Sequence, residues 1–278
     1  MFPASLLHTY RLGALSLIAS AQVRVACNAP PASTSVRALP TAPEVASGYR
    51  SDLHTQYATR HMAAAANPLA AAAGREMLRQ GGSAIDAAIA MQAVLTLVEP
   101  QSSGIGGGAM IVLWDGKAVR TYDGRETAPA GARETLFLQA DGKPMPFTQA
   151  QIGGRSVGTP GVLRALEMAH RQHGRLPWAT LFEPAIALAE KGFAISPRLH
   201  TMIASDPALP ASPEMAAYFL NADGSPKAIG TLLQNPPLAK VLKRIAKEGP
   251  DALYQGPIAE EIVARVQGSS NPGSLSLS

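Results

Sequence analysis

Residues 67–98 read NPLAAAAGREMLRQGGSAIDAAIAMQAVLTLV and predict two consecutive helices separated by a pair of glycines. The first helix begins after Asn67, whose side chain accepts a backbone N–H as the N-cap, and Pro68 suits the first helical turn. It extends to Gln80 and ends at Gly81-Gly82, because glycine readily adopts the left-handed conformation of a helix C-terminus. This helix is therefore expected as the first element of the folded part.

The second helix of this stretch has its own start and stop signals. Ser83 and Asp86 have the spacing of a capping box, in which each side chain accepts the other residue's backbone N–H. The helix runs from Ala84 to about Leu97 and is apolar on almost every side, so we expect it to be buried. Glu99-Pro100 ends it, since proline disfavours the α conformation of the residue before it.

A β-hairpin is expected after the cluster of glycines at 104–108. The apolar run Ala109–Trp114 predicts a strand, Asp115-Gly116 a two-residue turn, and Lys117–Tyr122 the returning strand. Phosphate-binding glycine loops lead into a helix whose N–H groups face the anion, and here a strand follows, so nucleotide binding is not indicated. The glycines instead predict a close approach of the backbone to a strand or a substrate.

Amphipathic segments alternate with proline and glycine in the second half of the chain. Three of them begin after a residue–proline pair and end at a glycine: Thr159-Pro160 to Gly174, Leu176-Pro177 to Gly192, and Asn235-Pro236 to Gly249. A last helix is expected from Pro257 to about Val266. Together with the hairpin, these elements predict a mixed α/β (α+β) fold.

The composition is that of a globular protein and excludes several classes. The 278 residues are 46% hydrophobic and 16% charged, which rules out a disordered acidic or basic tail. The net charge of +4 is scattered without a Lys/Arg run, so no nucleic-acid partner is expected. Cys27 is the single cysteine, which excludes a disulfide framework and a thiolate zinc site. His170 and His173 have a chelating i, i+3 spacing, but no carboxylate motif accompanies them and we expect no metal there.

The N-terminal residues have the pattern of an export signal. Residues 1–21 combine a short n-region closed by Arg11, the apolar run Leu12–Ile18, and the small residues Ala19-Ser20-Ala21 at a cleavage point. The apolar run is too short to span a bilayer. We therefore expect a signal peptide over residues 1–21 and a periplasmic or secreted protein.

Two alternatives remain for this end of the chain. Cys27 follows a small residue and would permit a lipid anchor in the membrane, although Arg24 stands where a lipoprotein signal has an aliphatic residue. The other alternative is a buried N-terminal helix. Residues 22–52 are rich in Pro, Ala and Ser and predict a flexible linker, so that the folded part covers residues 53–278.

Arg125 is the candidate binding residue, in the sequence YDGRETAP of residues 122–129. A guanidinium at the end of a strand can bind a substrate carboxylate through two parallel hydrogen bonds. A surface ion pair with Asp123 or Glu126 is the simpler interpretation of this arginine by itself. Gly124 is expected to let the chain turn, so that the side chain of Arg125 points into a site.

Several motifs, in their order along the chain, closely resemble the γ-glutamyltranspeptidase (glutathione hydrolase) family. They are NPLAAAAGREMLRQGGSAIDAAIA, EPQSSGIGGGAM, YDGRETAP, GRSVGTPG and GPDALYQGPIAEEI. The resemblance covers about residues 64–278. It implies an incomplete portion of the four-layer αββα sandwich of the N-terminal nucleophile hydrolases, made from an autocleaved precursor.

The resemblance also implies an activity. Members of the family cleave the γ-glutamyl amide of glutathione and related γ-glutamyl compounds through a threonine acyl-enzyme, and they transfer the γ-glutamyl group to water, amino acids or peptides. Their nucleophile is the first threonine of a small subunit, and no residue of this chain takes its place. We therefore expect a truncated large subunit that is inactive by itself and whose partner is the small subunit.

Within the chain, the resemblance assigns a role to Arg125 alone. This residue matches the family's arginine that binds the α-carboxylate of the glutamyl group. No catalytic residue, cofactor or metal is expected in the chain. A second hypothesis is a non-catalytic exported module that binds γ-glutamyl compounds or amino acids through the same arginine, or a pseudogene product.

Overall fold

The computed structural model describes residues 55–277, which form helices and two small antiparallel sheets. The predicted signal peptide (1–21), the predicted linker (22–52) and Cys27 lie outside the described residues. Within the described part, no helix is both long and apolar enough to cross a membrane.

The first two helices form as predicted. In α1 (Pro68–Arg79), the side chain of Asn67 accepts a backbone N–H of the first turn at 3.0 Å. In α2 (Ala84–Val98), the hydroxyl of Ser83 accepts the N–H of Asp86 at 3.2 Å, and the Asp86 carboxylate accepts the N–H of Ser83 at 2.7 Å. The capping box is thus confirmed in both directions.

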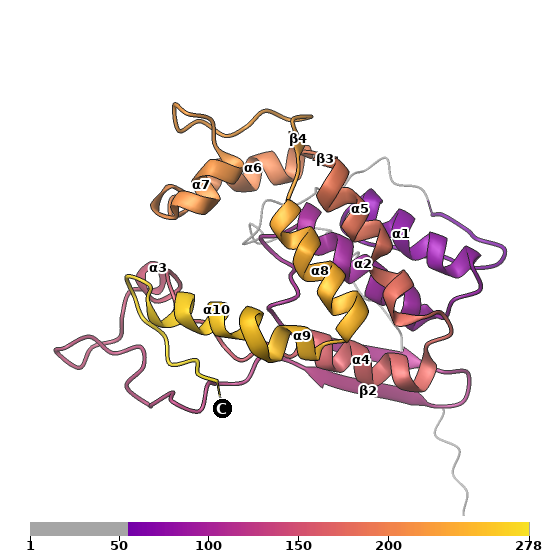
Figure 1. The fold of residues 1–278 in the computed structure, drawn as a ribbon, viewed down its shortest axis with the longest axis horizontal. Helices are drawn as coiled ribbons and strands as arrows, with labels where there is room; N and C mark the ends of the chain where they lie inside the picture. The colour runs from indigo at the N-terminus through magenta and orange to yellow at the C-terminus, as the bar shows by residue number, and fades with distance from the viewer. Residues whose placement is uncertain (1–54, 278) are drawn as a thin grey trace, which may run out of the picture. The chain divides into compact units, whose positions relative to one another are not determined.

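Helix α2 is buried among other helices, as its apolar sequence predicts. It packs against α1, α4 (Val162–His173), the 3-10 helix η1 (Trp178–Phe182) and α5 (Glu183–Lys191). Helix α8 (Pro236–Glu248) packs on α5 and η1 (Figure 1). The largest fully buried apolar side chains of this core are Met77, Ile89, Val94, Val98, Leu163, Leu181, Phe182, Ile195, Leu199, Leu242 and Ile245.

The hairpin consists of β1 (Ala109–Trp114) and β2 (Val119–Gly124), which pair antiparallel. One face packs against α4 (Figure 1), where Tyr122 is buried and its hydroxyl donates to the side chain of Gln172 at 2.8 Å. The opposite face exposes large apolar side chains, those of Met110, Val112, Trp114 and Val119.

The turn of the hairpin differs from its prediction. We expected the turn at Asp115-Gly116 and the second strand at Lys117–Tyr122, whereas the strand occupies Val119–Gly124 and Gly116-Lys117 form the tight turn. The Asp115 carboxylate accepts the N–H groups of both Lys117 and Ala118, at 2.9 and 2.8 Å. This side-chain bonding, together with a φ of +93° at Gly116, favours a turn that begins after the aspartate.

The predicted helices of the second half also form, with one change. The segments that end at Gly174 and Gly249 are α4 and α8, and the one that ends at Gly192 begins as η1 and continues as α5. Other short elements were not predicted. They are α3 (Phe147–Ala150), β3 (Phe193–Ala194), α6 (Pro197–Ser205), η2 (Leu209–Ala211), α7 (Pro213–Phe219), β4 (Leu232–Leu233) and α9 (Asp251–Tyr254). The last predicted helix is α10 (Gly256–Gln267).

The Asp86 side chain does more than cap α2. It is completely buried, and besides the N–H of Ser83 it accepts the N–H groups of Arg175 at 2.9 Å and Leu176 at 3.2 Å, in the loop after α4. The Nε2 atom of His170 bonds the carbonyl of Leu176 in the same loop at 2.9 Å and lies 3.5 Å from the Asp86 carboxylate. One carboxylate therefore joins the start of α2 to the end of α4.

We predict that Asp86→Ala lowers the free energy of unfolding by about 2–4 kcal/mol, because the three backbone N–H groups that one carboxylate oxygen accepts would lose their buried partner. Chemical denaturation monitored by circular dichroism measures the difference. The control is Asp141→Ala, because the Asp141 carboxylate accepts the N–H of Lys143 in an exposed turn. Equal midpoints for the two variants would show that the buried carboxylate does not hold this junction.

We also predict that the exposed apolar face of the hairpin makes the 278-residue chain bind a hydrophobic dye and self-associate. Replacing Trp114, which is 63% exposed, by lysine should weaken both effects with little change in the melting temperature. Ile111→Lys, on the packed face, should instead lower the melting temperature. Unchanged dye binding in Trp114→Lys would indicate that this face is covered in solution.

Candidate functional site

Three backbone segments meet beside the open end of the hairpin. They are the glycine loop 104–108, the segment 124–128 that begins with the last residue of β2, and the loop 158–161 that leads into α4. The carbonyl of Gly107 accepts two N–H groups from the start of α4, both at 3.1 Å. Thr127 and Thr159 exchange two backbone hydrogen bonds of 3.3 and 2.9 Å, so the second and third segments pair like strands.

Glycine is required where these segments touch. A Cβ atom at Gly124 would lie 2.5 Å from the Cβ of Ala165 in α4, and one at Gly108 would lie 2.7 Å from the carbonyl oxygen of Gly124. A Cβ atom at Gly161 would collide with the same carbonyl. The predicted close approach of the glycine cluster to a strand is thus confirmed.

The expected turn at Gly124 is not present. Gly124 is the last residue of β2, pairs with Ala109, and does not have a positive φ angle. Its lack of a side chain lets the strand lie directly on α4, and the chain leaves the strand only at Arg125. The position of the Arg125 backbone therefore depends on the packing of Gly124 against α4 and not on a flexible turn.

Arg125 has a largely exposed side chain, with 74% of its surface accessible. Its backbone N–H donates to the Asp123 carboxylate at 3.0 Å, so this acid supports the backbone. The guanidinium is 3.7 Å from the Glu126 carboxylate at its Nε atom. Most of its hydrogen-bonding edge is therefore open to a ligand carboxylate, with an acidic group next to it.

Two hollows adjoin Arg125, and both are also lined by Glu126 and Gly106. The first, of about 450 Å³, is bounded by the glycine loop with Gln101, Ser102 and Ser103. The second, of about 520 Å³, is bounded by residues 127–129, Leu136, Phe137 and residues 155–158. Volumes of this size are typical of small-molecule sites. The arrangement can thus bind a zwitterionic or anionic small molecule beside the glycine loop.

His170 and His173 lie away from these hollows and do not line them. His170 contacts the loop after α4, and His173 packs edge-on against Tyr122 at 6.3 Å between ring centroids. Among residues 55–277, no group of three or more His, Cys, Asp and Glu side chains is placed to hold a metal ion.

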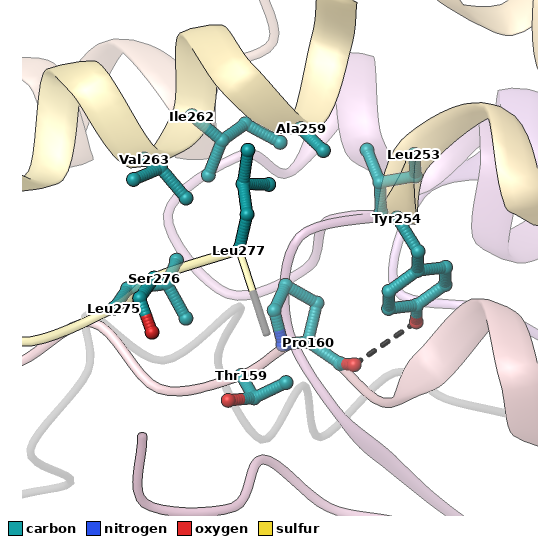
Figure 2. Close-up of a pocket in the computed structure, with 10 residues that line it drawn as sticks. All are labelled: Thr159, Pro160, Leu253, Tyr254, Ala259, Ile262, Val263, Leu275, Ser276 and Leu277. Atoms are coloured by element: carbon teal, nitrogen blue, oxygen red, sulfur yellow. Dashed lines mark hydrogen bonds between the residues drawn. The ribbon is translucent and has the colours of Figure 1, made fainter. Parts of the chain in front are cut away.

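A smaller hollow of about 210 Å³ lies between α9, α10 and the C-terminal segment (Figure 2). Its lining is mainly aliphatic, and Figure 2 shows the Leu277 side chain directed toward Ile262. Burial raises the pKa of the Tyr254 phenol, which stays protonated at neutral pH and donates to the carbonyl of Pro160 at 2.9 Å. This hollow offers no charged group to a ligand, and we assign it no chemistry.

Comparison with known proteins identifies the family. The model of the family described as gamma-glutamyltranspeptidase matches residues 70–277. The chain belongs to the γ-glutamyltranspeptidase family. The glutathione hydrolase proenzyme of Bacillus subtilis (strain 168) is 42% identical over 208 residues, which are 74% of this chain and 35% of that protein. Glutathione hydrolase 2 of Arabidopsis thaliana is 42% identical over 199 residues, 70% of this chain and 33% of that protein.

Solved structures agree with this assignment. The crystal structure of Helicobacter pylori gamma-glutamyltranspeptidase matches with a TM-score of 0.75 at 30% identity, over 81% of this chain and 64% of that one. The Pseudomonas nitroreducens enzyme complexed with L-DON matches with a TM-score of 0.72 at 31% identity, over 80% and 64%. The predicted N-terminal nucleophile hydrolase fold class is thereby confirmed. The chain spans about a third of the length of the curated relatives it matches.

The sequence indicated Arg125 as a site residue but did not indicate Arg155, which also lines the second hollow. There Arg155 lies against Leu136 and Asn271, which are distant in sequence. Gly154 was the available signal, because a Cβ atom at this position would collide with the carbonyl of Val266 in α10. A glycine beside an arginine in GRSVGTPG marks a close contact, although only the fold shows which segment is contacted.

We predict that Gly124→Ala lowers the free energy of unfolding by about 1–3 kcal/mol, since the added methyl group would overlap Ala165. Gly106→Ala is the matched control, because nothing lies within 4 Å of a Cβ atom there, and its effect should stay within about 0.5 kcal/mol. Thermal denaturation of the two variants beside the parent chain measures the difference. Equal stabilities would contradict the close packing of β2 on α4.

Proposed function

We propose that the protein is an exported γ-glutamyltransferase and glutathione hydrolase, for which this chain supplies the binding site of the glutamyl group. Two similar proteins are named glutathione hydrolase or its proenzyme, which supports this substrate class. The observation that carries the proposal is Arg125, exposed between two hollows with one carboxylate beside it. An exposed guanidinium next to an acidic group suits the α-carboxylate and α-ammonium of a glutamyl group.

The chemistry in this proposal is covalent. The hydroxyl oxygen of a threonine attacks the γ-carbonyl, the C–N bond breaks, and the amine leaves with a proton relayed by the threonine α-amino group. Water or an acceptor amine then attacks the acyl-enzyme ester and releases glutamate or a new γ-glutamyl amide. In the proposal, Arg125 fixes the donor while a small subunit provides that threonine.

The apolar face of the hairpin supports a small-subunit partner. Met110, Val112 and Trp114 alternate along one side of β1 and are exposed. A strand with apolar residues on both faces is typical of a sheet that is covered on both sides. We infer that further β structure of the same precursor covers this face in the assembled enzyme.

We predict that Arg125→Ala in a full-length, autocleaved precursor lowers kcat/KM for glutathione by an amount equivalent to about 2–5 kcal/mol. Lysine keeps the charge but not the paired N–H groups, so Arg125→Lys should also lower kcat/KM clearly, though less than Arg125→Ala does. The loss should appear mainly in KM, because the contact exists in the ground state and the transition state. Steady-state kinetics of glutathione hydrolysis measure it.

Arg120→Ala is the control, since Arg120 lies on β2, the strand that precedes Arg125, and pairs with Asp115 at the hairpin turn. It should retain kcat/KM within about twofold, as surface ion pairs contribute little. A kcat/KM of Arg125→Ala close to that of the parent would show that Arg125 does not bind the substrate and only forms a surface ion pair with Glu126. A full-length protein that binds glutathione without cleaving it would favour the non-catalytic binding module.

For the export part of the proposal, we predict that the mature protein begins near Gln22. The small residues at 19–21 are the expected cleavage point. N-terminal sequencing of protein recovered from the periplasm or the medium tests this. A lipid-modified Cys27 at the mature terminus would establish the anchored form instead, and an intact Met1 would contradict export.

A further inference from the structure

The larger hollow beside Arg125 contains a second guanidinium, that of Arg155. Both arginines line this hollow of about 520 Å³, and Glu126 is the acidic residue that lines it with them. The charged groups of the lining therefore sum to one excess positive charge. Phe137, whose side chain is 42% exposed, adds an apolar surface to the same hollow.

The position of Arg155 is fixed by bonds to two other segments. Its Nε atom donates to the Asn271 side chain at 2.6 Å, and one terminal nitrogen donates to the carbonyl of Leu136 at 2.8 Å. Its backbone N–H donates to the carbonyl of Asn271 at 2.9 Å. The Asn271 amide is held in turn by the carbonyls of Gln149 and Ile152, at 3.1 and 2.9 Å.

This arrangement leaves part of the guanidinium available. Within residues 55–277, the second terminal nitrogen of Arg155 has no hydrogen-bond partner, while the other two nitrogens are engaged. A side chain held by two neutral acceptors keeps its full charge, because no carboxylate neutralises it. The second terminal nitrogen of Arg155 is therefore already in place to donate a hydrogen bond to one anionic oxygen of a ligand.

The charges of the hollow match those of a particular class of ligand. A γ-glutamyl peptide such as glutathione carries two carboxylates, one at each end, and one ammonium group next to the first carboxylate. Two guanidinium groups and one carboxylate complement these charges one for one. An anilide or an ester of the same donor lacks the second carboxylate and leaves one guanidinium without a partner.

We propose that Arg155 binds the C-terminal carboxylate of a γ-glutamyl peptide donor, while Arg125 binds its α-carboxylate. The inference rests on the proposed function and adds to it the residue that selects peptide donors with a free carboxylate. The apolar side chain of Phe137 then lies beside the middle of the peptide. Arg155 is thus a specificity residue that acts on the leaving part of the donor.

The experiment compares glutathione with its glycine ethyl ester, which differ only in that carboxylate, as substrates of a full-length enzyme containing this chain. The parent should have a kcat/KM for glutathione at least about tenfold above that for the ester, as expected for hydrogen bonds to a charged group. In Arg155→Gln this ratio should fall to near one, because kcat/KM should decrease for glutathione and stay unchanged for the ester.

Arg133→Gln is the matched control. Arg133 is exposed on the loop that precedes Leu136 and does not line the hollow, so the variant removes an equal charge and should keep the parental ratio. Arg155→Lys serves if the glutamine variant does not fold, and should give an intermediate ratio. A parental ratio in both Arg155 variants, or an equal loss on both substrates, would overturn the proposal. A parent enzyme that cleaves neither substrate would instead refute the proposed function.

Discussion

The close contact of three glycine-containing backbone segments is the constraint on which the site depends. The carbonyl of Gly124 lies against Gly108 on one side and Gly161 on the other, at distances that leave no room for a methyl group. Because β2 is pressed onto α4 in this way, the chain leaves the strand at Arg125 with little freedom. The exposed guanidinium is therefore presented by a rigid base, which reduces the entropic cost of binding a carboxylate.

Helix α2 supports this base from the other side of the core. Its Asp86 carboxylate bonds the loop that follows α4, and its apolar side chains fill the space between α4 and α5. A displacement of α4 would move Gly161 and hence the carbonyl of Gly124. The buried capping residue and the exposed arginine thus belong to one continuous packing arrangement, although they are far from each other in sequence.

Local signals predicted the helices and the hairpin, because caps, prolines and glycines act on neighbouring residues. Asn67 and Ser83 marked their helices correctly, whereas the turn at Gly116 was misplaced by one residue because a side-chain bond of Asp115 decides it. The motif YDGRETAP indicated Arg125 as a candidate binding residue through its resemblance to a family. Arg155 could not be found in this way, since its partner Asn271 is brought to it only by the fold.

In the function that we propose, the site formed around Gly124 binds a glutamyl α-carboxylate through Arg125. A crystal structure of the full-length enzyme soaked with glutamate would locate that carboxylate. We expect both α-carboxylate oxygens within about 3 Å of two guanidinium nitrogens of Arg125, with the three glycine-containing segments unchanged. Glutamate bound elsewhere, with Arg125 still in solvent beside Glu126, would contradict it.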